Sequence, residues 1–202
     1  MNSVSDFIVS PLGLRYDNEI KVGKKKLITN ASIESYKHVN NIAKVISTPI
    51  IDSSDIKKGD LVLIHHNVFR RFYDIRGKEK NSKSYFKDNL FFCSTDQIYL
   101  YKTKKNWKSF GDRCFVKPIV NNNDLEVDKI LNHIGILKYG NSSLKQAGIT
   151  KGALVSFQPN SEFEFVVDKE LLYCMKSNNI VASHEYQGDE KEYNPSWAGS
   201  RR

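Results

Sequence analysis

The sequence predicts an all-β protein made of two repeated units. Short runs rich in valine, isoleucine and aromatic residues alternate with polar turn sequences, and helical periodicity is weak throughout the chain. The phrase IKKGDLVLI at residues 56–64 returns as ITKGALVSF at residues 149–157. Each copy has the pattern of a glycine turn that leads into a buried strand, so the repeat predicts two tandem folding units.

The length and composition agree with two globular domains. The 202 residues divide into two domains of about 100 residues each, which is a common domain size. Hydrophobic residues make up 40% of the chain and charged residues 27%, as in ordinary folded proteins. We therefore expect a sizeable core and exclude a wholly disordered chain.

Three more pairs of segments extend the repeat. In each copy an opening strand, a second strand and a closing phrase surround the glycine turn. The pairs are residues 7–11 and 114–118, 42–46 and 134–137, and 90–98 and 172–180. This order predicts a first domain at residues 1–101, a linker at 102–112, a second domain at 113–186 and a tail at 187–202.

The first unit carries two excesses. Residues 12–41 form a long stretch with few apolar residues, which predicts a functional or disordered loop. The second excess is an insertion at residues 65–87: Gly59 lies 39 positions before Ile98, whereas Gly152 lies 28 positions before Ile180, a difference of 11. We expect function to lie in these two segments, because loops tolerate insertions and carry binding sites.

The net charge of +8 leaves several partners open. The lysines are spread along the chain and form no single basic stripe, so single-stranded nucleic-acid binding is a lesser alternative. Cys93, Cys114 and Cys174 are odd in number and lack metal-ligand spacing, which favours reduced core residues. With no signal peptide and no apolar span of membrane length, we expect a cytoplasmic protein.

In this order, the segments resemble the chaperonin-10 (GroES) family, and each half is similar to one family subunit. The matching segments of the first half are residues 7–11 for the opening strand, 23–32 for the mobile loop, 42–46 for the next strand, 56–64 for the central phrase and 90–98 for the closing phrase. The resemblance implies two tandem GroES-like irregular antiparallel β-barrels. It also implies a homo-oligomeric ring that caps a GroEL-type chaperonin holding ATP.

Members of this family include bacteriophage-encoded forms that fold capsid protein and a double-domain form in plastids. The Asn- and Lys-rich composition agrees with a bacteriophage source acting in the cytoplasm of its host. The function implied by the resemblance is that of a co-chaperonin that assists protein folding. The alternative is a structural, virion or adaptor protein that keeps such barrels without docking on a chaperonin.

The resemblance implies a chaperonin-binding tripeptide after the glycine of the mobile loop. Lys26, Leu27 and Ile28 occupy this place, and two of the three are apolar as the family pattern requires. A disordered loop loses conformational entropy on binding, which keeps the attachment weak and reversible. Residues 121–128 of the second unit have neither a glycine nor a clear tripeptide, so we expect the first domain to dock.

The insertion in the first unit corresponds to the family's roof loop. Its aromatic and basic residues suit contact with another protein or an anionic polymer, and a hairpin folded on itself is the equal alternative. The candidate contact residues are His65, His66, Phe69, Arg70, Arg71 and Tyr73. Adjacent histidines in a strand point to opposite faces, so we expect no metal site there.

The tail ends in an acidic stretch followed by aromatic residues. Trp197 is its candidate anchor, on its own barrel or on a neighbour, because an exposed terminal tryptophan is unfavourable. No phosphate-binding loop, nucleophile elbow, zinc-protease motif or paired catalytic carboxylates occur in the sequence. We therefore expect no enzyme activity and no cofactor.

Overall fold

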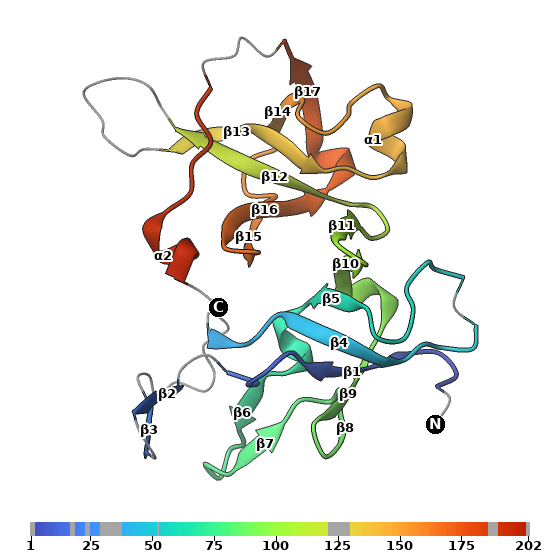
Figure 1. Cartoon of the computed structure of the whole chain (residues 1–202), viewed down its shortest axis with the longest axis vertical. Coiled ribbons are helices and arrows are strands. Elements are labelled where there is room, and N and C mark those ends of the chain that lie inside the picture. Colours follow the sequence, from blue (N-terminus) through green and yellow to red (C-terminus); the bar gives the residue numbers. More distant parts are fainter. Residues whose placement is uncertain are drawn as a thin grey trace. The chain divides into compact units, whose positions relative to one another are not determined.

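The computed structural model describes residues 3–16, 19–22, 25–28, 38–51, 53–120, 130–185 and 190–200, with only the backbone described at 19–22, 25–28 and 200. The expectation of an all-β chain is confirmed, since the described elements are antiparallel strands with only short helices (Figure 1). The chain divides into two compact units, Met1–Trp107 and Lys108–Arg202.

Unit 1 is built on one seven-stranded sheet. The strand order is β11-β10-β5-β4-β1-β9-β8, and β2-β3 and β6-β7 form two further two-stranded sheets, neither of which pairs with another of the described strands. The bounds are β1 Phe7–Pro11, β2 Glu19–Val22, β3 Lys25–Ile28, β4 Ile42–Ser47, β5 Leu61–Ile64, β6 Arg71–Tyr73, β7 Glu79–Asn81, β8 Tyr85–Lys87, β9 Leu90–Cys93, β10 Ile98–Thr103 and β11 Asn106–Ser109, with short 3-10 turns η2 His66–Val68 and η3 Thr95–Gln97.

Unit 2 is built on a six-stranded sheet. Its strand order is β15-β16-β12-β13-β14-β17. The bounds are β12 Arg113–Val120, β13 Ile130–Tyr139, β14 Leu154–Phe157, β15 Phe163–Val167, β16 Glu170–Lys176 and β17 Ile180–His184, with α1 Ser142–Gln146, η4 Ser177–Asn179 and α2 Ser196–Ser200. Side chains of β12, β13, β14 and β16 form a common core that includes Val116, Leu137, Val155, Phe157 and Met175.

The two sheets share one strand order. Read in the same direction, β10-β5-β4-β1-β9-β8 of unit 1 corresponds strand for strand to β17-β14-β13-β12-β16-β15 of unit 2. The described strands do not close either sheet into a barrel, because β11 and β8 are the edges of one sheet and β15 and β17 are the edges of the other. The repeat in the sequence therefore corresponds to a repeat in topology.

The glycine turns of the two copies adopt the same geometry. Gly59 has φ +96° and Gly152 φ +92°, in the left-handed region that favours glycine. The Gly59 N–H donates to the carbonyl of Val45, and the Gly152 N–H donates to that of Leu137, both at 2.8 Å. The turn thereby fixes the register of the buried strand that follows it.

The expected linker at residues 102–112 is largely strand. β10 continues to Thr103, β11 begins at Asn106, and the division between the two units falls within β11. Trp107 is buried, and the ammonium group of Lys102 lies 5.2 Å from the centre of its ring. Burial of a large aromatic side chain favours a packed hairpin over a free connection, and polar composition alone did not indicate this.

Candidate functional site

The base of the long loop at residues 12–41 is closed by a set of contacts that we call the loop neck, formed by Arg15, Tyr16, Val39 and Asn40. Tyr16 and Val39 form an antiparallel bridge, and both are buried. The Asn40 N–H donates to the carbonyl of Arg15 at 3.0 Å. The side-chain amide of Asn40 donates to the carbonyls of Leu12 and Leu14, each at 2.9 Å. The loop therefore starts and ends at a single fixed point of unit 1.

Arg15 of the neck holds the roof insertion, residues 65–87, through several contacts. Its guanidinium donates to the carbonyl of Phe69, to that of Arg70 at 3.0 Å and to Oδ1 of Asn81 at 2.6 Å. The same group lies over the ring of Phe91, 4.9 Å from its centre. One planar cation thus satisfies acceptors from two separate segments of the insertion, at residues 69–70 and at Asn81.

Tyr16 makes a second connection between the neck and the roof insertion. The N–H of Arg71 donates to the hydroxyl of Tyr16 at 2.6 Å, and the Arg71 guanidinium lies 4.6 Å from the centre of the Tyr16 ring. Arg71 also donates to the carboxylate of Glu79 at 2.9 Å. The β6-β7 hairpin is therefore attached to the base of the loop, so the two excesses of unit 1 form one assembly.

The charge of Arg15 persists in this setting. Burial lowers the pKa of Arg15 to about 10, and the positive charge of Arg71 contributes to the lowering. A pKa of about 10 keeps the guanidinium protonated at neutral pH. Its hydrogen bonds are consequently charge-assisted, which makes them stronger than bonds between neutral groups.

The structure places the candidate roof residues in different environments. Phe69 is fully buried, and its ring packs edge-on against Phe91 with centroids 4.8 Å apart. Phe69 is therefore a core residue and has no surface to offer a partner, which corrects its assignment as a contact residue. Arg70 and Arg71 are partly buried, whereas Tyr73 is exposed.

The two histidines lie in a turn, because β5 ends at Ile64. His65 caps η2 by accepting from the N–H of Asn67 at 3.0 Å, and the rings of His65 and His66 lie 4.2 Å apart. The expectation that the two side chains point to opposite faces of a strand is therefore wrong, since their rings lie side by side. Burial lowers the pKa of His66 to about 4, and the nearby His65 and Arg70 act in the same direction.

Lys26, Leu27 and Ile28 belong to strand β3. Their backbone pairs with β2, with Leu27 opposite Ile20 and Lys26 opposite Lys21. Their side chains lie outside the described part of the structure. Their role in docking therefore stays a prediction.

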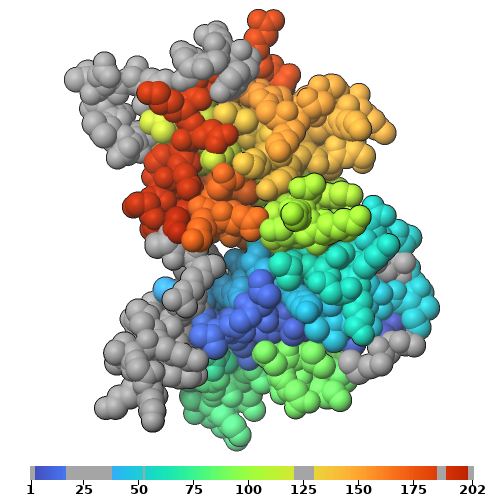
Figure 2. Space-filling view, in the orientation of Figure 1, coloured from blue at the N-terminus to red at the C-terminus, as the bar shows by residue number. Residues whose placement is uncertain are grey.

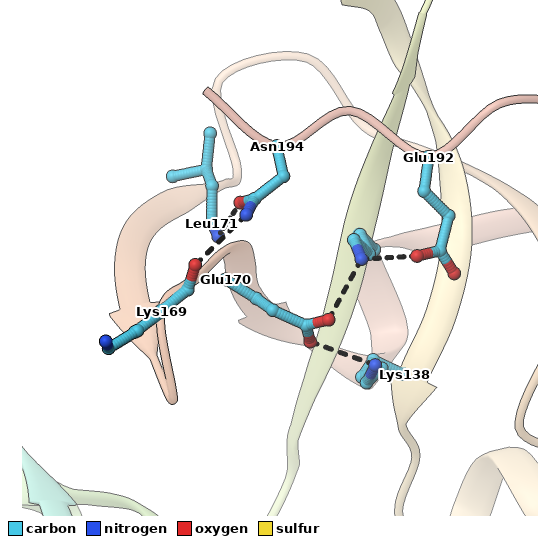
Figure 3. A network of polar contacts seen from close by, with 7 residues as sticks. Lys138, Lys169, Glu170, Leu171, Glu192 and Asn194 are labelled. Carbon is cyan, nitrogen blue, oxygen red and sulfur yellow. Dashed lines mark hydrogen bonds and ion pairs between the residues drawn. The ribbon is translucent and has the colours of Figure 1, made fainter. Parts of the chain in front are cut away.

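The tail is fastened to unit 2 by the polar network drawn in Figure 3. The buried ammonium group of Lys117 donates to Glu170 at 3.0 Å and to Glu192 of the tail. Asn194 accepts from the N–H of Leu171 at 2.9 Å and donates to the carbonyl of Lys169 at 3.0 Å. With these two bonds, the Asn194 side chain pairs with the main chain at the start of β16 in the way that a neighbouring strand would.

Hydrogen bonds between these groups also set their pKa values. Burial alone would lower the pKa of Lys117, but its hydrogen bonds to Glu192 and Glu170 outweigh burial and raise it. Burial alone would raise the pKa of Glu170, but hydrogen bonds from Lys138 and Lys117 outweigh burial and lower it. Lys117 and Glu170 are therefore charged at neutral pH, and the tail is attached through the ion pair of Lys117 with Glu192.

Trp197 itself is 44% exposed, whereas its neighbour Ala198 is fully buried in α2, which lies against β16. Within unit 2, the anchoring is therefore performed by Glu192, Asn194 and Ala198 as well as by any contact of Trp197. Sequence inspection selected the tryptophan for its size. It missed the small and polar residues because their partners lie far away in the chain.

Sequence inspection also missed Arg15, Tyr16 and Ile75, whereas Phe72 was among the aromatic residues expected to suit a partner. Phe72 is 40% exposed and Ile75 is fully exposed, and both lie in the roof insertion. The apolar character of Ile75 in a basic segment was a usable signal. Arg15 and Tyr16 gave no comparable signal, since nothing in a local pattern indicates a contact 54 or 55 positions away.

Sequence comparisons give no relative for this chain. Protein-family models find no match, and a search of curated proteins finds none either. Within the described ranges, no three His, Cys, Asp or Glu side chains are grouped to hold a metal ion. No helix in the described part of the chain has the length and apolar character to cross a membrane.

Proposed function

We propose that this chain is a tandem co-chaperonin, formed by two GroES-like barrels, that caps a GroEL-type chaperonin and assists protein folding. In this role it performs no chemistry itself and takes no cofactor. Lys26, Leu27 and Ile28 of β3 dock on the chaperonin in its ATP-bound state. Copies of the chain assemble into a ring, and the bacteriophage source expected from the resemblance would make a capsid protein the client.

The observation that carries the proposal is the unequal elaboration of a repeated frame. Both units have the same strand order and the same glycine turn, and in both the chain is paired at the base of the loop at the place of the family's mobile loop, by Tyr16 with Val39 and by Val120 with Ile130. The loop of unit 1 is the longer one, since it spans residues 17–38 whereas that of unit 2 spans residues 121–129. The β2-β3 hairpin beyond this neck pairs with no strand of the larger sheets in the described ranges. A binding segment of this kind meets its partner without disturbing the sheet that holds it.

The physics of the neck supports reversible docking. The Tyr16–Val39 bridge holds the two ends of the loop together before binding, which lowers the entropy cost of ordering a docking segment carried between them. The remaining ordering cost on docking keeps the affinity moderate, as a cycle of capping and release requires. Two apolar side chains, Leu27 and Ile28, contribute a few kcal/mol when they are buried in a partner, at about 1.5–3 kcal/mol each.

The proposal is tested by native mass spectrometry with a purified GroEL-type chaperonin and ATP. The parent chain is expected to form a ring and a capped complex, whereas the double variant Leu27→Ser with Ile28→Ser is expected to lose the complex. Ile50→Ser with Ile51→Ser is the matched control, since these neighbouring side chains of unit 1 are 68% and 72% exposed. This control is expected to bind like the parent.

Two results would contradict the proposal. A parent chain that never associates with the chaperonin under ATP would favour the structural or adaptor alternative. A Leu27→Ser and Ile28→Ser chain that binds as tightly as the parent would remove β3 as the docking segment. A refolding assay with a chaperonin-dependent client then checks that capping assists folding.

A further inference from the structure

The roof insertion presents an apolar surface to solvent. We call it the roof surface and define it by five side chains that are more than a third exposed. They are Phe72, Tyr73, Ile75, Tyr85 and Phe86. Figure 2 shows that this part of the chain, coloured in shades of green, forms part of the surface of unit 1. All five lie within residues 72–86, and such a concentration of exposed apolar side chains in one segment marks an interaction site more often than scattered single residues do.

The roof surface is also strongly basic. Residues 70–87 contain seven Lys or Arg and two Asp or Glu, which gives this segment a net charge of +5 within a chain of net charge +8. Among the described residues, Arg71 pairs with Glu79 (Nη1 to Oε1, 2.9 Å) and Lys80 lies near Asp74 (Nζ to Oδ2, 4.0 Å). The surplus of positive charge favours a partner that carries negative charge.

The β6-β7 hairpin adds a short strand edge to this surface. The two strands form a sheet of their own, with Phe72 opposite Lys80 and Tyr73 opposite Glu79. The N–H of Arg71 on β6 is used by Tyr16, but no described strand pairs with the outer edge of β7. An unpaired edge offers main-chain groups that an extended polypeptide can use.

We propose that the roof surface binds an acidic polypeptide segment in extended conformation, which adds to the edge of β7. Its carboxylates meet the surplus lysine and arginine charge, and its apolar side chains pack on Phe72 and Ile75. A single-stranded nucleic acid would use the positive charge and the aromatic rings, but it would not use the exposed aliphatic side chain of Ile75 or the strand edge of β7. The combination therefore favours a polypeptide. The proposal does not depend on chaperonin docking.

The test uses the full chain without chaperonin and three fluorescent probes: a peptide of alternating glutamate and valine, the same peptide with alternate backbone N-methylation, and an oligothymidylate. We expect the unmodified acidic peptide to bind, with affinity that falls as salt rises. N-methylation is expected to weaken binding about tenfold, since it removes main-chain donors that a β-strand needs. Fluorescence anisotropy measures all three.

Variants locate the site. Phe72→Ser with Ile75→Ser is expected to weaken peptide binding about tenfold, and Arg76→Gln with Lys78→Gln is expected to reduce its salt dependence. Phe163→Ser with Val181→Ser is the matched control, because these side chains on the edge strands of unit 2 are 64% and 59% exposed. All substituted side chains are exposed, and circular dichroism checks that each variant is folded.

Three outcomes would overturn the proposal. The first is that the acidic peptide does not bind. The second is that the N-methylated peptide or the oligothymidylate binds as tightly as the unmodified peptide, which would indicate charge attraction or a nucleic-acid site. The third is that the unit 2 control loses as much affinity as the Phe72 and Ile75 variant.

Discussion

Units 1 and 2 use one strand order for two different purposes. In unit 1, the first strand of the frame leads into the loop neck, where Arg15 and Tyr16 hold the roof insertion. In unit 2, the corresponding strand carries Lys117, which holds the tail. The shared strand order therefore fixes where the chain leaves the sheet. Single polar residues near these points, Arg15 and Tyr16 in unit 1 and Lys117 in unit 2, decide which segment is held against the sheet.

The same comparison holds at the level of individual positions. Pro11 of β1 pairs with Ala43, and Pro118 of β12 pairs with Gly135. Ser10 and Lys117 precede these prolines, so a small polar residue in unit 1 corresponds to a buried lysine in unit 2. When a substitution is made in one unit, hydrogen exchange lets the unaltered unit serve as the internal reference.

The largest effect is expected for Gly135→Ala in unit 2. A Cβ atom there would lie 2.5 Å from the carbonyl oxygen of Lys117 and 2.6 Å from Cγ1 of Val116, so the backbone of β12 has to shift. We expect a loss of about 3 kcal/mol in the unfolding free energy of unit 2. Hydrogen exchange of β12 and β13 amides measures it. Ala43→Gly at the matched position of unit 1 is expected to cost only about 1 kcal/mol. Equal losses would contradict a difference in packing between the two sites.

The next effect is expected for Arg15→Met. This change removes the guanidinium that bonds to Phe69, Arg70 and Asn81, and it leaves a buried carbonyl without its donor. We expect amides of the roof insertion to exchange about 30-fold faster, equivalent to about 2 kcal/mol. Lys57→Met, an exposed change in the same unit, is the control. Unchanged protection of residues 69–82 would show that the neck does not hold the roof insertion.

A smaller effect is expected for Lys117→Met. The apolar side chain fills the volume of the buried lysine, Glu170 keeps its ion pair with Lys138 at 2.9 Å, and Glu192 is released to solvent. We expect a loss of about 1–2 kcal/mol confined to the attachment of residues 190–199, since one buried ion-pair partner is replaced by a packed apolar one. Faster amide exchange or proteolysis in the tail measures it. Ser10→Ala at the matched position of unit 1 should leave the tail unchanged.

The smallest effect concerns pH and His66. Its pKa of about 4 in the folded chain is lower than its ordinary value of 6.5, so the unfolded chain binds a proton first as the pH falls. The contribution of neutral His66 to the stability of unit 1 is fully present above pH 6.5 and is lost as the pH falls from about 6.5 to 4. After allowance for partial exposure, we expect about 0.5–1 kcal/mol.

Denaturant unfolding of the parent and of His66→Gln at pH 7.5 and 4.5 measures this loss, with the unit 2 transition as the reference. The parent should lose more stability than the variant over this range. A parent and a variant that lose equal stability would contradict the lowered pKa of His66.

Local sequence patterns accounted for much of the frame. The apolar runs predicted the strands at residues 7–11 and 42–46, and the repeated glycine phrase predicted a turn before β5 and β14, as the structure has them. Strand β11, Asn106–Ser109, was missed because its residues are polar apart from Trp107. Only packing against the sheet makes this stretch a strand. Phe69 was misplaced for the opposite reason, since an aromatic residue next to arginines has the composition of a surface segment although its side chain is buried.

The sequence by itself determined the all-β class, the repeat and the two places where unit 1 exceeds unit 2. These features depend on turn geometry and on side-chain alternation over a few residues, which a sequence records directly. Only the tertiary structure decided that Arg15 holds a segment 54 positions away and that Lys117 holds a residue 75 positions away. The physical reason is that a buried cation binds whichever acceptors the fold brings to it, and their identity is not written in the residues that flank it.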